Sequence, residues 1–471
     1  MQNPIKDRFD RIRIINMEMI IIKPIFEQER QFLYKKIDVL LPTDCWRDGF
    51  KIYLDCTCMK PLYVFKVDNK LIKIIKDNSK LFTDYKQKKL GELIELYDDK
   101  LNQQKQKSID KTIEYILSHE NYNYVVSHSG GKDSTVIYNI WLKALDILKE
   151  QYPEIYNNLQ WEIIFANTSN DTADTYKLIK KLPQDKLHIL NPKVGFYQWI
   201  VKVKNYFVPS TMVRNCCSTY KEGQINKYYN KNENITNVLG VRKYESTKRA
   251  SFEYVMDNDF EVKLYGKNNN PKVWIKLAPI VEWKDEDVWL YILRYQLEYN
   301  NQYNVGFNRC GCLICPYQSD YIDLLIEENY SKQWMRWTEV LKRNYEIYDI
   351  KNHLKWTLEE WINGKWKRGT SKEYELINLA PTEDKVKELA KLKGISKTMA
   401  KKYWGKKCNC GKKLNPTEIA MNYKTFGRYE NIENDARQLL CKKCFCEQEG
   451  ISKKEYVELT YRYLEEGCNL F

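Results

Sequence analysis

Six consecutive residues have the types and spacing to hold a phosphate group: Ser129, Gly130, Gly131, Lys132, Asp133 and Ser134. The two glycines allow backbone angles that are closed to other residues and let a ligand approach the main chain. Successive N–H groups then face an anion, beside the positive end of a following helix. The lysine neutralises phosphate charge, and the aspartate suits a Mg²⁺ ion between itself and the phosphates. The segment therefore predicts a nucleotide-phosphate loop that uses Mg²⁺.

An ordinary turn and helix cap is the competing interpretation, because the Walker pattern G-x-x-x-x-G-K-[ST] is not met. The flanking segments favour the phosphate loop. Residues 122–129 form an apolar run typical of a buried strand, and residues 133–150 have the apolar periodicity of a helix. A glycine-rich turn between a strand and a helix is where anions bind to helix N-termini.

Two arginines follow another apolar run, in a loop that begins at Gly240. Arg242 and Arg249 carry guanidinium groups suited to bidentate contacts with oxyanions, and Glu245 is placed to orient one of them. The competing interpretation is a cluster of ion pairs on the surface. We expect this loop to lie beside the phosphate loop.

Cysteines are grouped along the chain, and in a reducing compartment such groups indicate metal or cluster ligation rather than disulfides. One set of four thiols, from two segments near the nucleotide motifs, suits an iron–sulfur cluster, although Zn²⁺ or free thiols are alternatives. Cys310 is a possible fifth ligand. The set consists of Cys216, Cys217, Cys312 and Cys315.

A second set has two short cysteine pairs about thirty residues apart, the first followed by glycine: Cys408, Cys410, Cys441 and Cys444. This spacing is typical of a zinc-ribbon knuckle, although C-x-C is one residue shorter than usual. We expect structural zinc here, with Cys446 as an alternate ligand and buried reduced thiols as the alternative. Cys45, Cys56 and Cys58 are assigned no site, because they offer three thiolates and few nearby histidines.

The elements that must position these residues alternate between apolar strands and amphipathic helices. This order predicts an α/β fold with a doubly wound parallel sheet covered on both faces. Asn167 closes the second strand, at the edge where open α/β sheets bind ligands. The expected strands are 122–129, 161–168, 186–190 and 237–242, and the expected helices are 133–150 and 172–182.

Five segments, taken in order, resemble the phosphoadenosine-phosphosulfate reductase branch of the PP-loop superfamily, the adenine nucleotide α-hydrolase-like proteins. Any one segment is a weak signal, and all of them in the expected order are a strong one. The resemblance covers residues from about 122 to 318, a little over two fifths of the chain. The segments are 129–134, 209–221, 240–249, 279–289 and 309–316.

The resemblance implies a protein that splits ATP between its α- and β-phosphates and releases pyrophosphate. ATP would then contact the phosphate loop, Asn167, Gly240 and Arg242, while Arg242 and Arg249 stabilise charge at the α-phosphate. Lys132 would hold the β- and γ-phosphates, and Asp133 would hold Mg²⁺. The first cysteine set resembles the ligands of a four-iron cluster in one class of sulfonucleotide reductase.

Two departures separate this chain from the reductases it resembles. Their phosphate loop usually lacks the Lys-Asp pair that Lys132 and Asp133 keep here. Their mobile tail carries a catalytic cysteine in E-C-G-x-H, whereas Cys468 lies in a different context. We therefore predict an ATP pyrophosphatase that adenylates an oxygen ahead of sulfur transfer, similar to the type found in DNA phosphorothioation systems. The alternatives are a sulfonucleotide reductase and a nucleotide-gated nucleic-acid-binding subunit without turnover.

Composition is that of a folded protein of 471 residues, with 43% hydrophobic and 30% charged residues. The net charge of +14 favours polyanionic partners, or reflects a lysine-rich composition bias. Residues 1–26 lack a signal-peptide pattern and no run is long enough to span a bilayer, so we expect a cytoplasmic protein without membrane contact. The expected domains are an N-terminal α+β extension (1–115), the nucleotide-binding domain (116–318), a mostly helical, basic region (319–400) and a small zinc-ribbon-like module (401–471).

Residues 388–407 loosely resemble a helix-turn-helix whose second helix would present three lysines; a solvated lysine-rich hairpin is at least as good an interpretation. With the zinc knuckle, this segment suggests a nucleic-acid platform, so DNA or tRNA is the expected acceptor. A sulfur donor such as a cysteine desulfurase is the expected protein partner.

Overall fold

The computed structural model describes most of the chain up to residue 368 and parts of the remainder. The described residues are 22–368 without 69, 121, 205, 212–214, 230–233, 247–248, 258–274, 349 and 355, then 387, 390, 391, 408, 410, 412, 414, 416–426 and 439–465. Arg214, Cys468 and nearly all of the helix-turn-helix-like segment 388–407 lie outside this part. None of the helices in it combines the length and apolar character that a membrane crossing requires.

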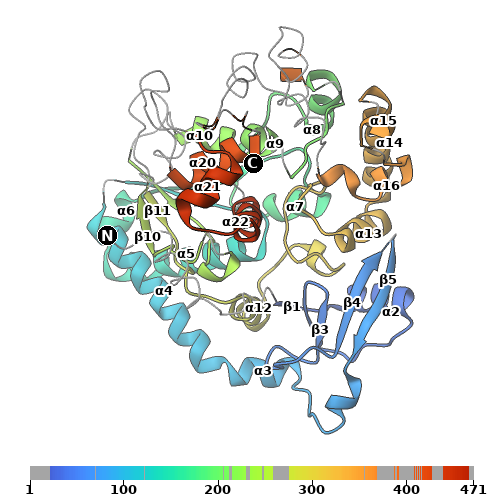
Figure 1. The fold of residues 1–471 in the computed structure, drawn as a ribbon. Helices are drawn as coiled ribbons and strands as arrows, with labels where there is room; N and C mark the ends of the chain where they lie inside the picture. The colour runs from blue at the N-terminus through green and yellow to red at the C-terminus, as the bar shows by residue number, and fades with distance from the viewer. Residues whose placement is uncertain are drawn as a thin grey trace.

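A six-stranded sheet forms the centre of the region at residues 116–318 (Figure 1), with strand order β10-β11-β9-β6-β7-β8. Five neighbouring strands run parallel, and β10 is antiparallel to β11 at one edge. The four predicted strands are confirmed as β6, β7, β8 and β9, whereas the β10–β11 pair was not anticipated. The strands are β6 (Asn123–Ser127), β7 (Gln160–Ala166), β8 (Leu187–Leu190), β9 (Ile235–Val238), β10 (Val255–Asp257) and β11 (Ile275–Leu277).

Helices cover both faces of this sheet, which confirms the doubly wound α/β fold. On β6, Tyr124 and Val126 pack with α5 and α4, while Val125 packs on the opposite face against Tyr229 of α10. Both faces of the strand are buried, which explains its uninterrupted apolar run. The helices are α4 (Asp98–Ser118), α5 (Lys132–Gln151), α6 (Pro153–Asn158), α7 (Ala173–Ile179), α10 (Gly223–Tyr229) and α12 (Asp285–Arg294).

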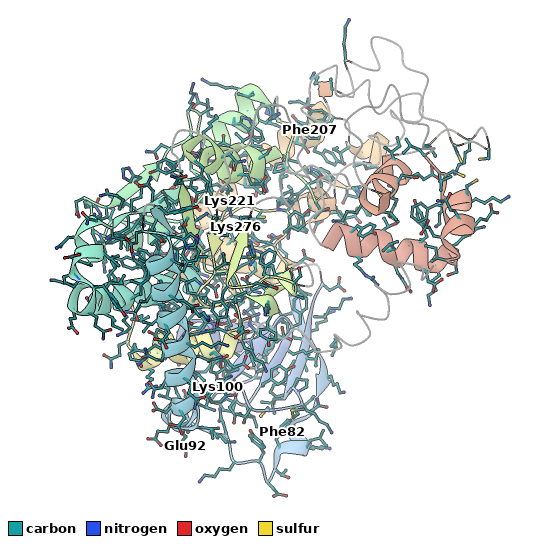
Figure 2. The ribbon with its side chains drawn as sticks, turned by 90° about the vertical axis from the view of Figure 1, so that its left-hand side faces the viewer. Phe82, Glu92, Lys100, Phe207, Lys221 and Lys276 are labelled. Carbon is teal, nitrogen blue, oxygen red and sulfur yellow. The ribbon has the colours of Figure 1, made fainter. Side chains whose placement is uncertain are left out.

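Helix α4 runs across the expected domain boundary at 115/116. Its apolar stripe, Ile109, Ile113 and Ile116, is buried in the same core as α5. Its first turns are held against α12 by side-chain hydrogen bonds, because Lys100 and Gln104 both donate to the carboxylate of Asp287 (Lys100 is labelled in Figure 2). The long helix therefore belongs structurally with the six-stranded sheet.

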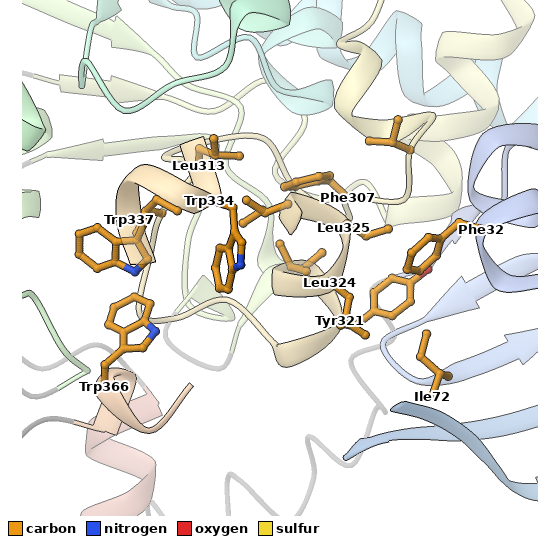
Figure 3. Close-up of a cluster of buried hydrophobic side chains, with 14 of the residues drawn as sticks. Phe32, Ile72, Phe307, Leu313, Tyr321, Leu324, Leu325, Trp334, Trp337 and Trp366 are labelled. Carbon is orange, nitrogen blue, oxygen red and sulfur yellow. The ribbon is translucent and has the colours of Figure 1, made fainter. Parts of the chain in front are cut away.

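The N-terminal part forms an antiparallel five-stranded sheet, β1 to β5 in sequence order, with α2 packed on it. One continuous core joins this sheet to the helices after residue 319, and Figure 3 shows Phe32 and Ile72 beside Tyr321, and Trp337 beside Trp366. The elements are β1 (Ile22–Pro24), α2 (Glu27–Ile37), β2 (Trp46–Asp48), β3 (Lys51–Tyr53), β4 (Tyr63–Asp68), β5 (Leu71–Asp77), α3 (Leu90–Leu96), α13 (Asp320–Asn329), α14 (Ser331–Ile347), α15 (Ile350–Leu354) and α16 (Leu358–Ile362).

A buried charge cluster joins this N-terminal sheet to Gly306 and Tyr321, which follow α12 in the chain. Glu29 is fully buried and accepts hydrogen bonds from Lys23, from Arg47 at 2.6 Å and from Tyr321 at 3.0 Å. Arg47 also donates to the carbonyl oxygen of Gly306 at 2.7 Å. Gly306 has φ +113°, and a Cβ there would lie 3.0 Å from Glu29, so the two segments touch through a glycine.

We predict that Arg47→Met lowers the free energy of unfolding by about 3 kcal/mol, because it removes one partner from a buried ion pair. Arg30→Met is the matched control, since Arg30 pairs with the exposed Glu27 and its loss costs less than about 1 kcal/mol. Urea unfolding followed by tryptophan fluorescence measures both. Equal effects of the two substitutions contradict the fastening role of Arg47.

Candidate functional site

The phosphate loop lies at the topological switch point of the sheet. From β6 the chain passes to β7 and β8 on one side, and β9 then returns to the other side of β6. Ligands of open α/β sheets bind at this point, beyond the carboxyl ends of the strands. Strand β6 ends at Ser127 and α5 begins at Lys132, so the predicted loop occupies this position.

Close packing fixes the shape of the loop. Gly130 has φ +76°, and a Cβ there would lie 2.9 Å from Thr175 of α7. Both the backbone angle and the space therefore require glycine. Asn300 donates to the Thr175 hydroxyl at 2.9 Å and holds this wall in place.

Side chains of the protein occupy the loop amides that were expected to face an anion. Gly130 N–H donates to Nδ1 of His128 at 3.2 Å, and Lys132 N–H donates to the hydroxyl of Tyr303 at 2.9 Å. Gly131 N–H reaches Oγ of Ser129 at 3.4 Å. A phosphate at these amides must replace these acceptors or bind beside them.

Four buried charged side chains meet at the start of α5. Lys132 contacts Asp133 and Asp285, each at 2.8 Å. Arg242 donates to Asp133 at 2.6 Å and to Asp285 at 2.8 Å, and its other nitrogen faces the carbonyl oxygen of Trp283. We call this set of Lys132, Asp133, Arg242 and Asp285 the charge network. It joins α5, the loop after β9 and the start of α12.

The charge network sets the ionisation of its members. Burial opposes the charge on Asp133, but Arg242 and Lys132 outweigh it and lower its pKa to about 2. Burial also opposes the charge on Arg242, whose pKa is nevertheless raised by Asp133 and Asp285. Asp133 and Arg242 therefore keep their charges at neutral pH.

Gly240 is the close contact that lets the loop after β9 reach α5. A Cβ at this position would lie 2.8 Å from the carbonyl carbon of Asp133, which is backbone and cannot move aside. The close packing gives a physical reason for glycine at this position, whereas the predicted contact between Gly240 and ATP stays a prediction.

Three further cations lie beside the network and toward the first cysteine set. Arg249 pairs with Glu245 and keeps 37% of its side chain exposed. Its pKa is lowered by burial and by Arg309, and the same Arg309 acts on Lys221. We call Lys221, Arg249 and Arg309 the cationic rim. Its positive charge is placed to attract an anionic ligand.

The first cysteine set is assembled in part. Cys217 and burial raise the pKa of Cys216, with further contributions from Cys312 and Cys315. Among the described residues, the sulfur atoms of the second cysteine set all lie within 4.8 Å of one another. The sulfur atoms of the first set do not form such a group, so they are spread more widely. Cys310 lies apart, because its thiol contacts the Tyr303 hydroxyl beside Lys132.

Buried amides hold the loop that carries Cys312 and Cys315. Asn170 accepts N–H groups from Leu313 and Ile314 and donates to the Ile314 carbonyl oxygen at 2.8 Å. Because Asn170 follows β7, this fixes the cysteine loop at the same edge of the sheet as the phosphate loop. Figure 2 labels Lys221. Cys312 raises the pKa of this lysine, although burial alone would lower it.

Asn167 lies at the end of β7 as predicted, but its side chain is engaged locally. It donates to Asn191 at 2.7 Å and accepts from the Tyr176 hydroxyl at 2.7 Å. These contacts join the end of β7 to its neighbours. A contact between this side chain and ATP stays a prediction.

The second cysteine set converges, as predicted: the ligand atoms of Cys408, Cys410, Cys441 and Cys444 all lie within 4.8 Å of one another. The elements described around them are helices, namely α20 (Pro416–Phe426), α21 (Lys442–Glu449) and α22 (Lys453–Glu465). Cys446 lies in the small core of this module. The four thiols form a group that can bind a metal ion.

Part of the chain is similar to known proteins. Residues 123–318 match the family described as the phosphoadenosine phosphosulfate reductase domain. An uncharacterized protein of Methanocaldococcus jannaschii is 28% identical over 260 residues, 54% of this chain and 57% of that protein. The adenosine 5'-phosphosulfate reductase 2 of Bacillus subtilis is 26% identical over 168 residues, 34% of this chain and 64% of that protein.

Among solved structures, the phosphoadenylyl-sulfate reductase of Candida auris is 16% identical, with a TM-score of 0.30, and the match covers 43% of this chain and 87% of that one. On this match, residues 123–318 are similar to the phosphoadenosine phosphosulfate reductase family of PP-loop proteins. The chain spans only about half the length of the first relatives that it matches.

Several site residues carried no separate signal in the sequence. Asp285 and Tyr303 reach the phosphate loop from more than 150 residues away, as the contacts with Lys132 show. Arg309 and Asn170 lie in or beside segments that were singled out, but only the packing reveals their neighbours. His128 directly precedes the loop, and its acceptor role depends on burial.

We predict that Gly240→Ala weakens ATP binding at least tenfold, because the added methyl group pushes the loop after β9 away from Asp133. Gly195→Ala is the control, since a Cβ there meets Ser169 at an ordinary 3.6 Å. Isothermal titration calorimetry measures both. Unchanged affinity in the Gly240 variant contradicts the close approach.

The buried side chain of His128 makes the stability of the folded protein depend on pH. Burial lowers its pKa to about 4, below the ordinary 6.5, so between these values the unfolded chain binds more protons than the folded one. Stability therefore falls as pH drops from 6.5 to 4, by roughly 3 kcal/mol from this group. His128→Asn keeps an acceptor for Gly130 N–H but does not titrate, so its urea midpoints at pH 7 and pH 5 should differ less than those of the wild type.

Proposed function

We propose that this chain is a PP-loop ATP pyrophosphatase that adenylates a substrate oxygen ahead of sulfur transfer, with a nucleic acid as acceptor. The observation that carries the proposal is the charge network. It holds the Lys-Asp pair of the loop, buried and charge-balanced, at the N-terminus of α5. A site for a nucleotide with a β,γ-pyrophosphate needs positive charge fixed where that leaving group departs. Lys132, held in place by Asp133 and Asp285, is the member of the network that can supply it.

In the proposed reaction, an oxygen of the acceptor attacks the α-phosphorus of ATP. The new O–P bond forms as the bond between the α-phosphorus and its bridging oxygen breaks, and pyrophosphate leaves with that electron pair. A sulfur nucleophile from the donor then displaces AMP from the activated position. When the donor is a persulfide, as an enzyme such as a cysteine desulfurase provides, its terminal sulfur makes this attack. A second thiol then cleaves the S–S bond between donor and product, which leaves sulfur on the acceptor and forms a disulfide with the donor cysteine.

The residues divide into contacting and positioning roles in this proposal. The cationic rim, Lys221, Arg249 and Arg309, faces the anionic part of the substrate. Arg242 is 1% exposed and its nitrogens are engaged, so it acts as a positioning residue rather than as a direct α-phosphate ligand. Lys132 binds the β,γ-phosphates when its ammonium group gives up its contact with Asp285 for a contact with a phosphate oxygen.

The predicted Mg²⁺ ligand does not fit the described contacts. Both carboxylate oxygens of Asp133 accept hydrogen bonds from cations, Oδ1 from Arg242 and Oδ2 from Lys132. A carboxylate so engaged acts as the counter-charge of two basic side chains. We therefore derive no step through Mg²⁺ bound at Asp133.

For the first cysteine set we propose an iron–sulfur cluster. Four thiols that are spread more widely than a single ion requires, and whose negative charges would repel one another, suit a larger cationic group. Such a cluster would supply electron transfer or sulfur binding when present. Cys216, Cys217, Cys312 and Cys315 would hold it, while Lys221 balances thiolate charge.

For the second cysteine set we propose one structural zinc ion.

A cytoplasmic location and the four domains assigned from the sequence are further proposals. Support for a nucleic-acid acceptor comes from the net charge of +14 and from the cationic rim.

A pyrophosphate-release assay with ATP, with and without DNA or tRNA, tests the proposed activity. We predict that Lys132→Met and Asp133→Ala each lower release at least 100-fold. The first removes the positive charge at the leaving group, and the second removes the carboxylate that holds Lys132 and Arg242 in place. Lys149→Met, in the last turn of the same helix, is the control and should retain wild-type release. Equal release by Asp133→Ala and the wild type removes the charge network from the mechanism.

The family match favours one second candidate, reduction of a sulfated adenylyl nucleotide. This activity predicts thiol-dependent sulfite release from such a nucleotide and no requirement for ATP. Sulfite release without pyrophosphate release would replace the proposed function with this one.

A further inference from the structure

The second cysteine set has the dimensions of a site for one ion. Sγ of Cys410 and Sγ of Cys441 lie 3.7 Å apart, and all four sulfur atoms fall within 4.8 Å of one another. Tetrahedral coordination with Zn–S bonds of about 2.3 Å places sulfur atoms about 3.8 Å apart. A multi-iron cluster spreads its thiolates over several metal atoms and needs more room. The spacing therefore fits a single tetrahedral ion.

One buried carboxylate joins the two halves of this site. Glu418 of α20 is 2% exposed, and its Oε1 accepts the backbone N–H of Lys442 at 2.8 Å and Nζ of Lys412 at 2.9 Å. Lys442 directly follows Cys441, and Lys412 lies two residues after Cys410. The same oxygen thus bonds to a residue beside each cysteine pair.

A buried amide on the next turn of α20 holds the segment before Cys441. Asn422 is 1% exposed. Its side-chain oxygen accepts the backbone N–H of Leu440, and its side-chain nitrogen donates to the carbonyl oxygen of Leu440, each at 2.8 Å. Its side chain also donates to the Glu418 carbonyl oxygen at 2.6 Å. Cys441 is therefore fixed from both sides, by Asn422 before it and by Glu418 after it.

The surrounding core is small, which makes such links important. It consists of about a dozen buried side chains from α20, α21, α22 and the cysteine segments, with Met421 and Phe445 fully buried. A core of this size supplies little stability by itself, and small natural domains add a structural metal or disulfides to compensate. Cys408 and Cys441 belong to the same core, so ion binding and helix packing are parts of one structure.

We propose that Glu418 and Asn422 are positioning residues that pre-form the zinc site, so that zinc binding and the packing of α20, α21 and α22 form one cooperative unit. This rests on the zinc proposed for the four cysteines and does not depend on the chemistry of the nucleotide site. Partners that orient metal ligands typically change metal affinity by 10- to 100-fold when they are lost.

The experiment uses the full chain, purified with its metals. Elemental analysis of the wild type should give one zinc per chain, lost in Cys441→Ser. Zinc transfer to a chromogenic chelator should be at least tenfold faster in Glu418→Ala and Asn422→Ala. Glu418→Gln keeps an oxygen for the Lys442 N–H and should restore most of the slow release. Glu458→Gln is the matched control, since Glu458 is exposed on α22.

A spectroscopic readout separates positioning from a general loss of stability. In the Co²⁺-loaded protein, the visible absorption of tetrahedral thiolate coordination should weaken in Glu418→Ala and stay unchanged in Glu458→Gln. If the wild type contains zinc, and Glu418→Ala and Glu458→Gln release it at equal rates, the positioning role is overturned while the proposed zinc site stands. Absence of zinc, or iron at these cysteines, overturns the proposed zinc as well.

Discussion

The charge network of Lys132, Asp133, Arg242 and Asp285 is the constraint on which the nucleotide site depends. Two positive and two negative side chains are buried together, with distances of 2.6 to 2.8 Å between partners. An unpaired charge in such a place is costly, so each member requires the others. The phosphate loop, the loop after β9 and the start of α12 are brought together by this requirement. Gly240 permits the approach, because any side chain there would meet the backbone of Asp133.

The network also connects to the N-terminal sheet through the segment at residues 300–307. Tyr303 accepts the N–H of Lys132, while Gly306 accepts a hydrogen bond from Arg47 and Asn304 accepts one from the backbone of Glu29. One short segment thus contacts the start of α5 and the buried charge cluster of the N-terminal sheet. The N-terminal sheet is thereby a structural support of the phosphate loop rather than an appendage.

Much of the fold could be predicted from the sequence, because buried parallel strands leave uninterrupted apolar runs. The run at 122–129 and the periodic segment at 133–150 gave β6 and α5 almost at their observed bounds. The edge pair β10–β11 was missed, since three-residue strands leave no periodicity to detect. The antiparallel N-terminal sheet was anticipated only as part of an α+β extension at residues 1–115.

The candidate site was predictable where chemistry and chain order coincide. Local motifs identified the phosphate loop, Arg242 and both cysteine sets. What they did not reveal is which groups neutralise one another after folding. Asp133 was expected to hold Mg²⁺, whereas packing pairs it with Arg242, which lies 109 residues away. Tyr303 and Asp285 were missed for the same reason, because long-range contacts leave no mark in local spacing.

The most direct test of the account is the identity of the products formed from ATP. Incubation of the full chain with ATP and an acceptor nucleic acid, followed by ³¹P nuclear magnetic resonance, distinguishes the two bonds that can break. Cleavage between the α- and β-phosphates predicts pyrophosphate, with the AMP moiety either released or attached to the acceptor. Formation of ADP and inorganic phosphate, or no consumption of ATP, contradicts the account.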